Sequence, residues 1–150
     1  MNSPLINRLI STNASLAPLA VRIPVGIIFL AHGAQKLFGW FGGYGLAGTA
    51  GWMDSIGLHP GTVLALLAGS AEFFGGLALL LGLFVRPASV ALAFTMLVAI
   101  FSVHISKGLF LSNGGYEYGL ALLAVTVALV ISGAGRFSVD DVLARNGAAR

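Results

Sequence analysis

The stretch LLAGSAEFFGGLALLLGLF, residues 66–84, decides the fold, because it is almost continuously apolar and holds a single ionisable residue, Glu72. In an α-helix, roughly 20 apolar residues cross a hydrocarbon core of about 30 Å. The stretch therefore predicts a membrane-spanning helix with a carboxylate near its middle. A carboxylate at that depth is costly unless it is protonated, paired or reached by water, so Glu72 needs a partner or a polar pocket.

The composition of the whole chain is typical of a membrane protein. Of its 150 residues, 57% are hydrophobic and only 9% are charged, against about 25% charged in soluble domains. The net charge is +3, but the eight basic residues are scattered, so we expect no nucleic-acid binding. The chain has no cysteine, which excludes disulfides and thiol chemistry. Its histidines lack metal-ligand spacing, and we predict no metal site.

Three further apolar runs accompany the first. We predict one all-α domain, a four-helix transmembrane bundle with spanning helices at about residues 18–38, 62–85, 87–106 and 116–132 and with tails at 1–17 and 133–150. The glycine- and aromatic-rich segment between the first two helices predicts an outer loop. A short interfacial helix in this loop would place Trp40, Tyr44 and Trp52 at headgroup depth. Only Arg86 separates the second helix from the third, which begins at Pro87, and this predicts a tight turn.

The arginines and lysines predict how the bundle is oriented. Four spans put both termini on the same side of the membrane. All six arginines lie on or near that side, whereas the two lysines, Lys36 and Lys107, lie towards the other. Because the cytoplasmic ends of membrane helices carry an excess of Lys and Arg, we predict that both termini are cytoplasmic. The chain would then be a multi-pass protein of the bacterial inner membrane.

Polar side chains gather in the outer half of this predicted bundle. His32, Gln35 and Lys36 are three or four residues apart and share one side of the first helix. His104 lies near the outer end of the third helix, and Glu117 opens the fourth. If these sides face inward, they converge on a pocket with the carboxylate of the second helix at its floor. We predict a ligand-binding pocket formed by His32, Lys36, Glu72, His104 and Glu117.

Each of these residues also has a purely structural interpretation. Glu72 can fix helix register through an ion pair or a hydrogen bond, with His32 from above or Arg22 from below, and the residues leave that choice open. Arg22 can instead extend to the cytoplasmic surface, and Glu117 can favour a helix N-terminus. Small residues let membrane helices approach closely. We assign structural roles to Arg22, Gln35, Gly75 and Gly76.

Three segments carry a resemblance to a known family. They read RIPVGIIFLAHGAQKLFG (residues 22–39), AEFFGGLALLLGLFVRPAS (71–89) and SNGGYEYGLALLAVTVALVISGAGRFSVDD (112–141). Together they resemble the DoxX family of small four-helix bacterial membrane proteins. The resemblance implies a link to redox homeostasis and to membrane-bound oxidoreductase complexes, because the family name derives from subunits associated with thiosulfate:quinone oxidoreductase. The lack of cysteine argues against a direct thiol or sulfur-relay role.

Three functional hypotheses remain open on these observations. In the first, the pocket binds a quinone, and the chain is a redox-associated subunit that passes electrons only with a partner oxidoreductase. In the second, the pocket binds or carries a lipid or another small hydrophobic molecule. In the third, the chain is a membrane anchor that assembles a partner, alone or as a homo-oligomer. The sequence has no internal repeat and no polar column through its inner half, which argues against a transporter or a channel. No catalytic residue is assigned.

Overall fold

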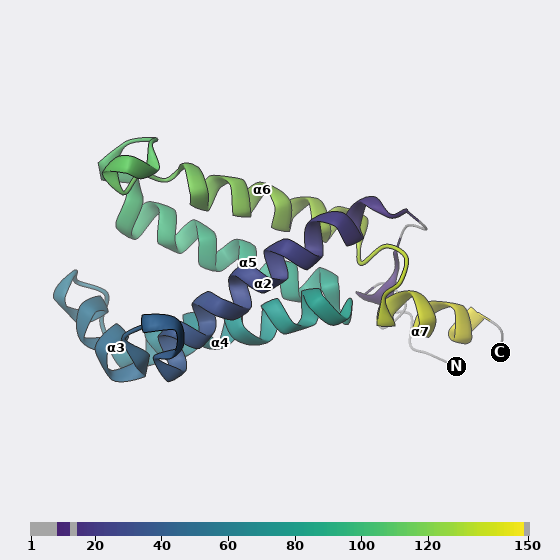
Figure 1. The fold of residues 1–150 in the computed structure, drawn as a ribbon, viewed down its shortest axis with the longest axis horizontal. Coiled ribbons are helices and arrows are strands. Elements are labelled where there is room, and N and C mark those ends of the chain that lie inside the picture. The colour runs from purple at the N-terminus through teal and green to yellow at the C-terminus, as the bar shows by residue number, and fades with distance from the viewer. Residues whose placement is uncertain (1–8, 13–14, 149–150) are drawn as a thin grey trace.

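The computed structural model describes residues 9–12 and 15–148, which form helices and connecting loops without a strand. The predictions for tail residues 1–8, 13–14 and 149–150 lie outside the described residues. The helices are α2 (Ala17–Phe38), α3 (Gly45–Ser55), α4 (Gly61–Leu81), α5 (Val85–Ala99), α6 (Glu117–Ser132) and α7 (Val139–Ala148). Helices α2, α4, α5 and α6 run along the molecule, with α3 at one end and α7 at the other (Figure 1). The predicted all-α class is confirmed.

Three helices among the described residues are long and apolar enough to cross a membrane. Two are α2 and α4. The third is the continuous segment Val85–Lys107, in which α5 passes into a π-helical turn, η2 (Ile100–His104), and then a 3₁₀ turn, η3 (Ile105–Lys107). Helix α6 is also apolar, but it has only 16 residues.

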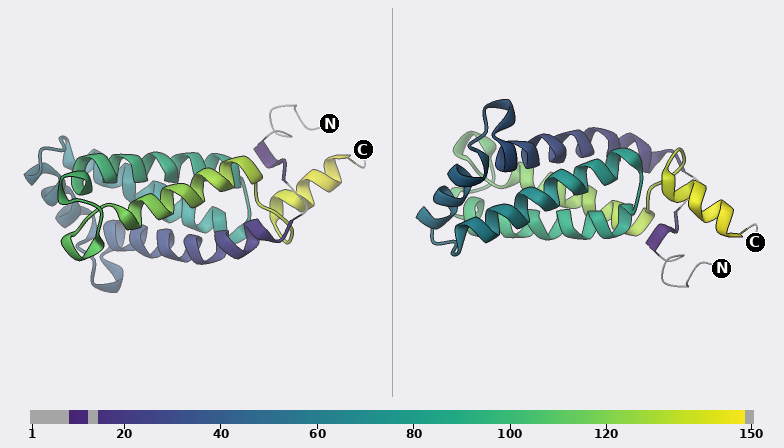
Figure 2. Two further views of the ribbon diagram at one scale, coloured as in Figure 1. Left: turned by 90° about the horizontal axis from the view of Figure 1, so that it is seen from above. Right: turned by 90° about the horizontal axis from the view of Figure 1, so that it is seen from below.

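The two ends of the bundle are built from different parts of the chain. Helix α7 and the described segment before α2 lie together at one end (Figure 2). Helix α3 and the loop around the short turn η4 (Leu111–Asn113) lie at the other. The polar residues predicted for the outer pocket lie towards this second end.

The turn between α4 and α5 comes earlier than the sequence predicts. Helix α4 ends at Leu81, and Gly82 and Phe84 take left-handed backbone conformations, with φ of 66° and 49°, so the chain reverses there. Arg86 and Pro87 already belong to the first turn of α5. A proline is tolerated at that position because first-turn N–H groups have no partner within the helix.

Helices α2 and α4 form the most extensive helix pair, and glycines allow their close approach. A Cβ atom at Gly33 would collide with the backbone of Phe73, and one at Gly76 with the backbone of Leu30. Gly75 faces the opposite way, towards the side chain of Leu92 on α5. Van der Waals packing of small residues is a main source of helix association in lipid, so these glycines fix the register of α2 against α4.

Apolar side chains fill the interior of the bundle and also cover its outside. The buried core includes Phe29, Leu79, Leu92 and Leu129. On the same helices, large apolar side chains that are more than half exposed include Ile27, Phe74, Phe94 and Ile131. An exposed apolar surface of this extent is typical of membrane or protein interaction sites, and here it surrounds the bundle.

Candidate functional site

Glu72 forms a buried ion pair with Lys36. The carboxylate on α4 is 3% exposed, and its Oε2 atom lies 2.5 Å from Nζ of Lys36 on α2. The Lys36 side chain is 25% exposed. Sequence reasoning placed both residues in one pocket but proposed His32 or Arg22 as the partner of Glu72, and that proposal is wrong. Removing one member of a buried pair is strongly destabilising, because it leaves an uncompensated charge.

Glycines on both helices set this pairing. Gly69 precedes Glu72 by one helical turn, and a Cβ atom there would lie 3.3 Å from Cβ of Lys36. Gly69 therefore lies against the side chains of Leu37 and Lys36, and its lack of a side chain leaves room for both. Gly33, one turn earlier on α2, packs against the backbone of α4 in the same way. The contact between charges thus depends on the small residues around it.

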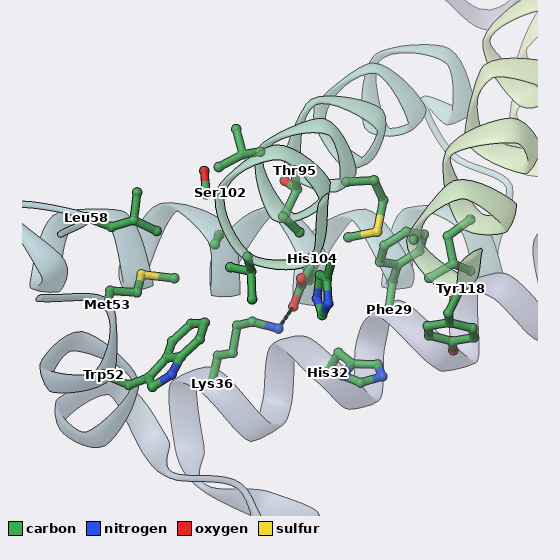
Figure 3. Close-up of a pocket in the computed structure, with 18 of the residues that line it drawn as sticks. Phe29, His32, Lys36, Trp52, Met53, Leu58, Thr95, Ser102, His104 and Tyr118 are labelled. Atoms are coloured by element: carbon green, nitrogen blue, oxygen red, sulfur yellow. Dashed lines mark hydrogen bonds and ion pairs between the residues drawn. The ribbon is translucent and has the colours of Figure 1, made fainter. Parts of the chain in front are cut away.

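The ion pair opens into a cavity of about 270 Å³. Side chains from α2, α3, α4, the α5–η2 segment and α6 line this pocket (Figure 3). Its walls are mainly apolar and aromatic, including Phe29, Trp52, Met53, Met96 and Leu122. Small-molecule sites are typically apolar cavities of roughly 300–1,000 Å³ with a few convergent polar groups. The volume here is near the lower end and suits one ring-sized head group.

His104 lines the pocket from the π-helical turn η2. Its Nδ1 atom lies 2.6 Å from the carbonyl oxygen of Gly114. Because a carbonyl only accepts hydrogen bonds, Nδ1 is the donor in this contact. The sequence predicts a regular helix through this region, and its apolar pattern gives no signal for a π-turn. Such turns occur frequently at functional sites.

His32 and Tyr118 stand together on one side of the pocket (Figure 3). They come from α2 and α6, two helices that pack on each other far less than α2 packs on α4. Both side chains are exposed at the surface of the bundle as well as to the cavity. His32 makes no hydrogen bond within the described part of the chain, and the ion pair of Glu72 is with Lys36 instead.

Two of the residues singled out from the sequence lie outside the pocket lining. Glu117 was predicted to bind the ligand, but its Oε1 atom accepts a hydrogen bond from the N–H of Leu111 at 2.6 Å, so it orders the η4 loop. Gln35, assigned a structural role, donates to the carbonyl of Phe41 at 3.3 Å. Both side chains turn towards loops, where they bind backbone groups that have no partner within a regular helix.

Arg22 is 1% exposed, and among the described residues its hydrogen bonds all go to backbone carbonyls. It donates to Leu79 at 2.8 Å, Leu80 at 2.9 Å, Ala134 at 3.0 Å and Phe137 at 2.6 Å. The guanidinium group therefore joins the end of α4 to the segment that precedes α7. The two sequence interpretations were that Arg22 pairs with Glu72 or extends to the surface. The structure shows neither.

Asp140 is a buried residue that sequence reasoning missed. Its two carboxylate oxygens accept hydrogen bonds from the N–H groups of Phe84, at 2.8 Å, and Val85, at 3.0 Å. Asp140 thus caps the start of α5 from another helix, a role that local sequence patterns do not reveal. Burial raises the pKa of Asp140, although these two amides and the nearby Arg22 and Arg86 oppose the rise.

Comparison with known proteins agrees with this architecture. The DoxX family model matches residues 17–105. The putative oxidoreductase CatD of Bacillus subtilis is 32% identical over 114 residues, which is 76% of this chain and 78% of the relative. The inner membrane protein YqjF of Escherichia coli is 34% identical over 131 residues, 83% of this chain and 90% of the relative.

A third relative covers nearly the whole chain. The uncharacterized membrane protein Rv3486 of Mycobacterium tuberculosis is 31% identical over 152 aligned positions, 95% of this chain and 90% of the relative. No solved structure matches the chain. The predicted membrane location is confirmed by the family match together with the apolar helices. The chain belongs to the DoxX family of membrane proteins.

Proposed function

We propose that this chain binds the head group of a quinone in the pocket at the Lys36–Glu72 pair and acts as the membrane subunit of a redox assembly. The observation that carries the proposal is a buried ion pair at the edge of a mainly apolar, ring-sized cavity. A purely structural pair would be expected to be enclosed by packed side chains. Here the charges border open space instead.

The chemistry of the lining suits a quinone. Lys36 has three N–H donors and uses one on Glu72, so others remain to donate to a ring oxygen. Phe29, Trp52 and Met96 offer apolar and aromatic surface to the ring. A few polar groups that orient a mainly apolar ligand are the usual design of a small-molecule site.

We propose a four-span topology for this function, with α6 as the fourth span and both termini in the cytoplasm. Helix α6 extends about 24 Å at about 1.5 Å per residue, and local thinning of the bilayer accommodates a short span. Arg86, Arg136 and Arg145 lie towards the α7 end, which the positive-inside rule assigns to the cytoplasm. The pocket then lies in the outer half of the membrane.

Access to the pocket is proposed to be lateral, between α2 and α6. These helices pack sparsely on one another, and His32 and Tyr118 line the cavity there while also facing outward. A quinone with its tail in the bilayer would slide its ring between them. This route needs no opening towards water.

The redox part of the proposal rests on the chain's own chemistry and on one relative. With no cysteine in its sequence, the chain has no thiol to relay electrons. A bound quinone would be the carrier, and a partner oxidoreductase would exchange electrons with it. The name of the Bacillus subtilis relative, a putative oxidoreductase, favours this assignment over a membrane anchor without chemistry.

The test is the quinone content of the protein purified in mild detergent, measured by mass spectrometry. We expect close to one quinone per chain in the wild type and at least a tenfold loss in Glu72→Gln, because the variant leaves Lys36 without its counter-charge. Asp141→Asn is the matched control, since it makes the same chemical change at the α7 end. A phospholipid in place of the quinone, or unchanged quinone in Glu72→Gln, would contradict the proposal.

A further inference from the structure

We infer that the pocket prefers the reduced, hydroxyl-bearing form of the ring to the oxidised form, and that His104 sets this preference. The inference rests on the proposed function and specifies its ligand. It follows from the hydrogen-bonding capacity that the described side chains leave free inside the cavity.

The tautomer of His104 is fixed by the loop behind it. Nδ1 lies 2.6 Å from the carbonyl oxygen of Gly114, so the neutral ring carries its proton on Nδ1. Its other nitrogen, Nε2, then has a free lone pair and no proton. Because His104 lines the cavity, the ring offers the ligand an acceptor.

The loop holds that carbonyl firmly. Gly114 has φ of 75°, a conformation that favours glycine, and the N–H of Gly115 donates to the carbonyl of Phe110 at 3.0 Å. The N–H of Tyr116 donates to Gly108 at 3.1 Å. Rotating the histidine ring would give up its bond to a well-ordered carbonyl, so the acceptor stays towards the pocket.

Two further acceptors border the same cavity. Oε2 of Glu72 accepts from Lys36, whereas Oε1 accepts no hydrogen bond from any residue the structure describes. The hydroxyl of Thr95 donates to the carbonyl of Ala91 at 3.0 Å, which leaves its oxygen lone pairs for the pocket. The cavity therefore combines one cationic donor, Lys36, and the hydroxyls of Ser102 and Tyr118, which can donate or accept, with the acceptors of His104, Glu72 and Thr95.

This set matches a quinol better than a quinone. The oxygens of a quinone only accept, so they can satisfy Lys36 but leave the acceptors of His104 and Glu72 without donors. Each hydroxyl of a quinol both donates and accepts, and can bond to an acceptor and to Lys36 together. Leaving buried polar groups unpaired is costly and is how sites reject ligands that lack a hydroxyl.

The experiment compares binding of ubiquinol-1 and ubiquinone-1 to the detergent-purified protein without oxygen. Quenching of Trp52 fluorescence reports binding, in a Trp40→Phe background so that the pocket tryptophan is the single source of signal. We expect the quinol to bind about tenfold more tightly than the quinone. In His104→Phe, which keeps a ring but removes one of the acceptors, we expect this ratio to fall several-fold. His104→Gln keeps an acceptor and should retain part of the preference.

The outcomes separate this inference from the proposed function. Equal binding of the two forms to the wild type, or an undiminished preference in His104→Phe, overturns the quinol preference and leaves quinone binding intact. Binding of neither form to the folded wild type overturns both. The wild-type ratio decides the inference even if the histidine variants do not fold.

Discussion

At the scale of single residues, the ionisable groups of this chain fall into two separate sets. Lys36, Glu72 and His104 border the cavity. Arg22 and Asp140 are as buried as Glu72, but they bind backbone groups at the opposite end of the bundle. Burial alone therefore does not distinguish a ligand site from a structural clamp. The useful distinction is whether unused donors and acceptors face open space.

Four of the five residues predicted to bind a ligand line the cavity, whereas its apolar lining and the Lys36–Glu72 pair were not predicted. Helical spacing placed His32 and Lys36 on one side of α2, but the predicted depths placed His32 nearer to Glu72 than Lys36 and so favoured His32 as the partner. Choosing between His32 and Lys36 as the partner requires the register of α2 against α4. That register depends on how the glycines of α2 and α4 interlock, such as Gly33 with the backbone at Phe73, which spacing along one helix cannot specify.

Asp140 gives a prediction for stability. Truncating it in Asp140→Ala removes both hydrogen bonds that cap α5, and loss of a helix cap costs about 1–2 kcal/mol. We expect a lower unfolding temperature in detergent. Asp141→Ala, which removes a neighbouring exposed pair with Arg145, should change stability much less.

The raised pKa of Asp140 adds a dependence on pH. The folded chain holds the proton of the Asp140 carboxyl group more tightly than the unfolded chain does. The stabilisation of the fold by this proton is fully present below the ordinary pKa of 3.8. It declines as the pH rises through the raised pKa of the folded state. The unfolding temperature of the wild type should therefore fall, relative to that of Asp140→Asn, as the pH rises over this interval. If the unfolding temperatures of the two proteins change with pH in the same way, burial does not shift the pKa of Asp140.

At the scale of helices, the α2–α4 pair determines whether the site exists. Gly33→Ala adds a methyl group where the backbone of α4 leaves no room, and overpacking of this kind costs about 1–3 kcal/mol. We expect both a lower unfolding temperature and loss of bound quinone, because separating the helices pulls Lys36 away from Glu72. Both quantities are measurable on one purified sample.

Gly51→Ala on α3 is the matched control for that variant. A Cβ atom at Gly51 would meet nothing within 4 Å, and alanine is favoured over glycine in helices by about 1 kcal/mol. Stability should be unchanged or slightly improved, and quinone should be retained. Equal losses in both variants would mean that the effect does not come from helix contact.

Helix boundaries show where local patterns fail. Apolar runs located α2, α4 and α5 well, because length and hydropathy are properties of the segment itself. The reversal at Gly82 and Phe84 and the π-turn at Ile100–His104 are accompanied by contacts from elsewhere, with the carboxylate of Asp140 and the carbonyl of Gly114. Contacts between distant segments are not encoded in the pattern of one helix.

At the scale of the whole molecule, the proposed topology puts α7 and the pocket on opposite sides of the membrane. The absence of cysteine makes this testable with single cysteines. Ser112→Cys in the η4 loop should react with a membrane-impermeant maleimide on intact spheroplasts, whereas Arg145→Cys on α7 should react only after permeabilisation. The reverse pattern would invert the bundle, and reaction of both before permeabilisation would contradict four spans.

The central claim is that a quinone occupies the cavity at the Lys36–Glu72 pair, and photo-crosslinking tests it most directly. Membranes containing the protein would be illuminated with an azido-ubiquinone, and the modified peptides identified by mass spectrometry. Our account predicts adducts on pocket residues such as Trp52, Met53 and Met96, lost on competition with excess quinone and in Glu72→Gln. Adducts confined to the α7 end or spread over the outer faces of the helices, or adducts that persist in Glu72→Gln, would contradict it.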